Sequence, residues 1–191
     1  MKKLALFIFV YSFFSFSVFS QSQYKLSCDS AQGQEFKKAD TYVRASVDES
    51  GHLRIFTSDA REIVLQKDSG QVGFDKVVIS EDGHSVGWVA LYPNSSTSYP
   101  IPLKLMIYSS GDLSTLTGIG EPVWRWHFTA RGKQVAFEQE TTHGSQGIHY
   151  ELREVATGRL IAEYEPEYGP DNLPIDIQNV PKWVEELNVK Q

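Results

Sequence analysis

A hairpin pattern between Val78 and Leu91 is the sequence feature that most constrains the fold. The turn Ser80-Glu81-Asp82-Gly83-His84 is followed by a run in which both sets of alternating positions are apolar. A short side-chain oxygen at the first turn position can accept a hydrogen bond from the backbone N–H two residues on, and glycine adopts the positive φ that a type I turn with a bulge requires. Because a strand that is apolar on both faces is covered on both faces, we expect the second strand inside a layered β structure.

Related turns lie around Gly51 and Gly132. Each has an apolar residue, then Asp, Ser or Thr, two variable residues, the glycine, and a basic or imidazole side chain. An aromatic residue follows each of the three glycines at the same spacing, as Phe56, Trp88 and Phe137. Hairpins of this kind occur in every β protein, but three in one chain predict a repeated β unit.

The N-terminus has the layout of an export signal. Met1-Lys2-Lys3 is basic, the stretch 4–19 is apolar and uncharged, and Ser20 offers a small residue at a cleavage site. This predicts a signal peptide over residues 1–20 and a secreted or periplasmic location. The apolar run is shorter than the ~20 residues that cross a bilayer as a helix. A retained membrane anchor is the alternative.

The charge balance excludes one class of partner. The chain carries 18 basic and 24 acidic residues, for a net charge of −6, and no basic cluster follows the predicted signal. Nucleic acid is therefore not an expected partner, and no stable membrane insertion is expected after signal removal. Residues 21–41 form a polar, aperiodic leader that we expect to be flexible. It contains Cys28, the lone cysteine, so an internal disulfide is excluded.

Alternating apolar residues predict strands over residues 42–166. Turns divide them into two units of four strands and a shorter first unit, with the second unit starting at Lys76. Within the tail 167–191, Pro181 suits a first helical turn, and a short helix is expected at 180–189. The predicted fold class is all-β, with antiparallel four-stranded propeller-like blades, two full and one partial, and a short C-terminal helix.

The tryptophans and one phenylalanine recur at the period of a strand. This spacing predicts core packing between sheets for Trp88, Trp124, Trp126 and Phe137. A role in stacking against a ligand is the alternative for these aromatic residues.

The turn 80–84 with Val86 and Trp88, together with the later turn 155–159 (Val-Ala-Thr-Gly-Arg), resembles the blades of β-propellers of the WD-like and Tol type. The resemblance covers about two thirds of the chain. It implies a scaffold for protein contacts and, less often, for an enzyme site. Closed propellers need ~4–8 blades, and this chain has two and a fraction. The alternatives are a small open stack of sheets and a homo-oligomer that completes a ring, since open edges invite pairing.

Two motifs raise the question of catalysis. The segment Gly83-His84-Ser85-Val86-Gly87 spells the Gly-x-Ser-x-Gly of a nucleophile elbow, but an elbow lies between a strand and a helix, and here a strand is expected on both sides. His143 and His149 flank a loop near two glutamates, without the paired cysteines or helical His-Glu motif of a metal site. No catalytic residue, metal or cofactor is therefore predicted.

The expected binding surface lies at one end of the units. In an antiparallel four-stranded unit the connections between the second and third strands emerge at the same end, and these are 92–102 and 141–147. Binding residues commonly lie on long loops of a rigid sheet. The candidates are Tyr92, Asn94, Tyr99 and His143. The predicted function is a non-catalytic scaffold that binds another protein there. The alternative is a small secreted hydrolase or carbohydrate-acting enzyme with its site at the same end.

Overall fold

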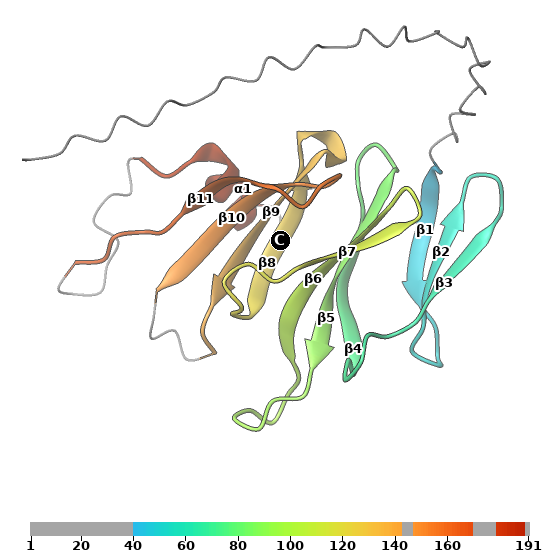
Figure 1. The fold of residues 1–191 in the computed structure, drawn as a ribbon, viewed down its shortest axis with the longest axis horizontal. Helices are drawn as coiled ribbons and strands as arrows, with labels where there is room; N and C mark the ends of the chain where they lie inside the picture. The colour runs from blue at the N-terminus through green and yellow to red at the C-terminus, as the bar shows by residue number, and fades with distance from the viewer. Residues whose placement is uncertain (1–39, 143–146, 170–178, 190–191) are drawn as a thin grey trace, which may run out of the picture. The chain divides into compact units, whose positions relative to one another are not determined.

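The computed structural model describes residues 40–142, 147–169 and 179–189. These residues form three antiparallel sheets of three, four and four strands in chain order (Figure 1). The first sheet contains β1 (Tyr42–Val47), β2 (Leu53–Thr57) and β3 (Glu62–Leu65). The second contains β4 (Gly73–Ile79), β5 (Ser85–Tyr92), β6 (Ile101–Ser109) and β7 (Asp112–Leu116). The third contains β8 (Val123–Thr129), β9 (Gln134–Glu140), β10 (Ile148–Glu154) and β11 (Leu160–Tyr164), and the helix α1 (Lys182–Val189) follows.

The predicted fold class is confirmed: the described chain is all-β and antiparallel, with two four-stranded sheets, one shorter sheet and a short C-terminal helix. None of the described helices is both long and apolar enough to cross a membrane. The predicted signal peptide 1–20, and the leader 21–41 apart from its last two residues, lie outside the described residues.

Two strand boundaries differ from the predicted ones. β4 begins at Gly73, before the expected start at Lys76, and β6 begins at Ile101, so the connection after Tyr92 is shorter than 92–102. Pro102 was expected to end a loop because it lacks an amide hydrogen. It lies instead inside β6, where a register shift between Ala90 and Leu91 accommodates it.

All three repeated glycines lie at strand-to-strand corners with positive φ, but they do not lie at the same end. Gly132 approaches Ser80 and Asp82, so the Gly83 and Gly132 turns adjoin. The amide of Tyr42, at the start of β1, donates to the Gly83 carbonyl oxygen at 2.7 Å. The Gly51 turn follows the far end of β1 and therefore lies at the opposite end. The same local pattern therefore occurs at corners in different positions of the units, because it specifies a strand-to-strand corner and not the end of the sheet at which that corner lies.

The sheets pack face to face through two apolar layers. One face of β5, with Trp88, packs toward the first sheet, and the other, with Val89, packs toward the third. The prediction that this strand is covered on both sides is thus confirmed. Trp126 and Phe137 lie in the second layer, and Trp124 is half-buried beside it.

The outer faces of the first and third sheets differ. α1 covers the outer face of the third, where its Val184 and Leu187 pack on Tyr150 and Leu152 of β10. The outer face of the first sheet carries ion pairs of Arg54 with Asp48 and Glu62, beside the exposed Val64.

Candidate functional site

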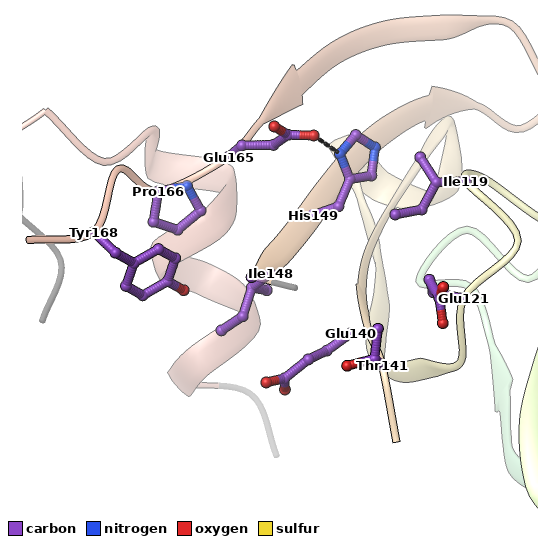
Figure 2. A pocket seen from close by; sticks show the side chains of 10 residues that line it. Ile119, Glu121, Glu140, Thr141, Ile148, His149, Glu165, Pro166 and Tyr168 are labelled. Carbon is purple, nitrogen blue, oxygen red and sulfur yellow. Dashed lines mark hydrogen bonds and ion pairs between the residues drawn. The ribbon is translucent and has the colours of Figure 1, made fainter. Parts of the chain in front are cut away.

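A cavity of about 300 Å³ lies at the end of the third sheet that is opposite the Gly132 turn. Four chain segments line it: the connection from β7 to β8, the end of β9, the start of β10 and the residues after β11. The lining residues are Ile119, Glu121, Glu140, Thr141, Gly147, Ile148, His149, Glu165, Pro166 and Tyr168. In Figure 2, Tyr168 and Pro166 form one side of the cavity, and Ile119 and Glu121 form the opposite side. The cavity therefore combines apolar walls with carboxylates.

His149 is the most buried ionisable group in this lining, with 5% of its surface exposed. Its Nδ1 lies 2.8 Å from Glu165 Oε1, the contact drawn in Figure 2, and its Nε2 lies 3.2 Å from Glu151 Oε1. Arg153 Nε donates to the other oxygen of Glu151 at 2.5 Å. Residues 149, 151 and 153 share one face of β10, because side chains alternate along a strand. A carboxylate therefore lies beside each ring nitrogen of His149, which leaves neither nitrogen facing the open cavity.

Two further carboxylates face the cavity without a bonded partner. The side chains of Glu121 and Glu140 line it, are half-buried, and form no hydrogen bond or ion pair with any other described residue. Burial raises the pKa of the Tyr168 hydroxyl, and the charge of Glu140 raises it further. Negative charge therefore accumulates at this site, next to an aromatic ring.

Gln139 positions one wall of the cavity. It is fully buried on β9, and its Nε2 donates to the carbonyl oxygens of Thr117 and Glu121 at 2.9 and 2.6 Å. Its Oε1 accepts the amide of Ile119 at 3.0 Å. These three bonds hold the connection between β7 and β8 against β9. Gly118 allows the approach, because its φ is +49° and an added Cβ would meet Gln139 Oε1 at 1.8 Å.

The residues predicted from sequence lie elsewhere. Tyr92 is buried, its hydroxyl donates to Asp68 Oδ2 at 2.8 Å, and Lys104 lies over its ring. Asn94 and Tyr99 share the loop after β5, where Asn94 Oδ1 accepts a backbone amide and Tyr99 is 52% exposed. None of these three lines the cavity. His143 lies outside the described residues.

The structure does bring the two predicted loops to one end. β5 and β9 both run away from the adjoining Gly83 and Gly132 turns, so the connections that follow them emerge at the opposite end (Figure 1). Thr141 and Gly147, the described ends of the predicted loop 141–147, line the cavity. The sequence did not point to Glu121, Glu165 and Tyr168, because they come from segments that were not expected to meet.

The Gly-x-Ser-x-Gly segment is structural. Ser85 begins β5, is 3% exposed, and its hydroxyl donates to Ser109 Oγ at 3.0 Å. Gly83 has a φ of +73° at the corner, and Gly87 lies where an added Cβ would be 2.5 Å from Trp126 Cη2. Turn geometry and close packing account for both glycines of the motif. Among the described residues, no group of three or more His, Cys, Asp or Glu side chains could hold a metal ion.

Comparison with known proteins gives no family. No family model matches the chain, and no curated protein matches it. Among solved structures, a chain of hydrazine synthase from Kuenenia stuttgartiensis is similar at a TM-score of 0.37 and 16% identity. The similarity covers 70% of this chain and 38% of that chain, and at this TM-score it carries no argument about function.

Proposed function

We propose that this chain is an exported, non-catalytic β-repeat module that binds another protein, and that the cavity of the third sheet receives a basic side chain of that partner. The observation that carries the proposal is the pairing of a small cavity with the unbonded carboxylates of Glu121 and Glu140. Small-molecule sites are commonly ~300–1,000 Å³ and mostly apolar. This cavity is at the lower limit of that range, and its polar lining suits one charged side chain better than a whole ligand.

Lysine and arginine complement such a lining in two ways. The ammonium or guanidinium group is attracted by the carboxylates of Glu121 and Glu140, and it also binds favourably to the face of a tyrosine ring such as that of Tyr168. The aliphatic stem of either side chain packs on apolar walls such as Ile119 and Pro166. Because the carboxylates are half-buried, salt screens the attraction less than it screens an exposed pair.

The alternative is a small secreted hydrolase or carbohydrate-acting enzyme. A histidine beside carboxylates is a frequent acid–base set, and His149 with Glu165 is the observation in its favour. It is less well supported, because both ring nitrogens of His149 already face carboxylates. No serine or cysteine is present among the described residues that line the cavity.

An NMR titration of the isotope-labelled chain tests the proposal. Nα-acetyl-arginine amide is the probe, and the uncharged Nα-acetyl-norleucine amide is its control. We expect the arginine probe to shift the amide signals of Glu140, His149 and Tyr168 in a saturable way, and the norleucine probe to leave them unchanged.

Two matched variants test whether the arginine probe binds in the cavity. Glu140→Gln removes a lining charge and should weaken binding about three- to tenfold, the loss of a partly screened ion pair. Glu167→Gln removes an exposed charge that does not line the cavity and should bind as the parent does. Equal responses to both probes, or equal effects of both variants, would contradict a charge-selective pocket.

A further inference from the structure

Among the described residues, the first sheet has one strand fewer than the other two sheets, and the position of that strand can be assigned. Tyr42, at the start of β1, is hydrogen-bonded to the Gly83 turn, and β5 also starts from that turn. β1 therefore runs from the same end as β5, and it corresponds to β5 as the second strand of a four-stranded unit. The strand that is missing from the described part of the chain is thus the first one, the counterpart of β4 and β8, and its place lies along the free edge of β1.

The backbone of that edge is available for pairing. The Asp48 amide donates to the His52 carbonyl oxygen at 2.9 Å, which fixes the hydrogen-bond phase of the β1–β2 hairpin. Since bonded and non-bonded pairs alternate along an antiparallel ladder, the amide and carbonyl groups of Ala45 and Val47 point away from β2. No described residue pairs with them on that side. Val47 is also 43% exposed, so an apolar side chain lies open beside the free edge.

The neighbouring sheet indicates the charge of the occupant. Lys76 Nζ on β4 donates to the Trp124 carbonyl oxygen on β8 at 2.6 Å and so links the first strands of two successive units. Asp75 and Trp124 lie the same number of residues before their turn glycines, Gly83 and Gly132, and therefore occupy equivalent positions in the second and third sheets. β1 lies next to β4, which carries Asp75. A basic side chain on a strand at the β1 edge would therefore face the Asp75 carbonyl oxygen and its exposed carboxylate.

We propose that the free edge of β1 is a docking site for an extended segment of a partner protein, which adds as the fourth strand of the first sheet and presents a lysine or arginine to Asp75. Strand addition of this kind takes its affinity from main-chain hydrogen bonds and its selectivity from alternate side chains. The site is separate from the cavity of the third sheet, so either can fail without the other.

Sequence argues against the chain filling the site itself. Residues 30–39, which would supply the strand if it followed the pattern of the other units, contain a glycine and only one residue of the types enriched in strands, Phe36. Such composition disfavours a strand. A partner segment is therefore the expected occupant, and the leader of this chain and a second copy are the competing ones.

Amide hydrogen exchange of the full chain, followed by NMR, tests the site. The probe is a short synthetic peptide of alternating valine and threonine with one central lysine. In the free chain we expect the amides of Ala45 and Val47 to exchange at least ~10-fold faster than that of Ser46, which pairs with β2. Millimolar probe should slow them, whereas the same peptide with alternate N-methylated amides should not.

Three variants test whether the peptide protects these amides by binding at the β1 edge. Ala45→Pro removes an outward amide without breaking the β1–β2 ladder and should abolish protection by the peptide. Val47→Lys places a repelling charge on the same edge and gives a second test if the proline variant does not fold. Val64→Lys changes a valine of equal exposure on β3 and should leave peptide binding unchanged.

Each competing occupant predicts a different result in the exchange experiment. If Ala45 and Val47 are already protected in the full chain, and deletion of residues 1–39 removes that protection, the leader fills the site. If protection rises with protein concentration together with a dimeric mass, a second copy fills it. Either result, or a peptide that protects neither amide, would overturn the proposal.

Discussion

Gly87→Ala tests whether close packing between the second and third sheets explains the second glycine of the Gly-x-Ser-x-Gly segment. An added Cβ would lie 2.5 and 2.8 Å from Cη2 and Cζ3 of Trp126 and 3.0 Å from Ile107 Cδ1. Carbon atoms in contact are normally ~3.5–4.0 Å apart, so the indole must move by roughly 1 Å. Overpacking of this kind costs about 1–3 kcal/mol, and replacing a glycine by alanine returns about 0.4–1 kcal/mol through the unfolded state.

We therefore expect Gly87→Ala to lower the free energy of unfolding by about 1–2 kcal/mol, measured by urea denaturation. Trp126→Phe removes the ring atoms that collide, so adding Gly87→Ala to it should cost little. The double-mutant cycle should show a coupling of about 1 kcal/mol or more. Gly73→Ala is the control, because its added Cβ would come closest to the movable end of Leu91. A Gly87→Ala protein as stable as its parent, or a cost that persists in the Trp126→Phe background, would refute the packing argument.

Two further predictions concern polar groups. Lys104 and the Tyr92 hydroxyl hold the pKa of Asp68 at about 2, so the charged form of Asp68 stabilises the fold above about pH 4, and this contribution is lost as the pH falls toward 2. Asp68→Asn should therefore lower the melting temperature at pH 7 and have no effect near pH 2 in thermal scans; an equal deficit at both pH values would exclude the charge as the cause. Gln139→Leu should cost about 2–4 kcal/mol in urea denaturation, because it removes three hydrogen bonds to partly buried backbone groups, each worth about 0.5–1.5 kcal/mol net. A loss below about 0.5 kcal/mol would show that water replaces the amide.

Strands and turns were predictable because their determinants are local. The turn pattern predicts a side-chain oxygen that accepts the amide two residues on. The Ser80 hydroxyl accepts the Ser85 amide at 2.9 Å instead, and the Asp48 carboxylate accepts the His52 amide at 2.9 Å, so both bonds reach further along the chain than predicted. Thr129 makes no such bond, and the turn after it is a short 3-10 segment with three successive positive φ values. The turn pattern thus predicted where in the sequence each corner falls, but not its detailed hydrogen bonding or backbone geometry.

The candidate site was less predictable. Tyr92 was inferred to bind because it borders a long loop, but the adjacent linker supplies Asp68, which engages its hydroxyl. Conversely, Glu165 and Tyr168 follow the last strand and have no sequence pattern of their own. They meet His149 and Ile148 only because β11 pairs beside β10.

The sequence by itself determined an all-β chain, the number of strands in each unit, the glycine corners and the buried central strand β5. These features depend on residue chemistry and alternation within a few neighbouring positions. Only the tertiary structure decided the end at which each corner lies, which carboxylates gather around the cavity, and that β1 is an edge strand of the first sheet among the described residues. Those outcomes depend on contacts between residues far apart in the chain, such as Gln139 with Thr117 and Tyr42 with Gly83, and no local pattern encodes such pairings.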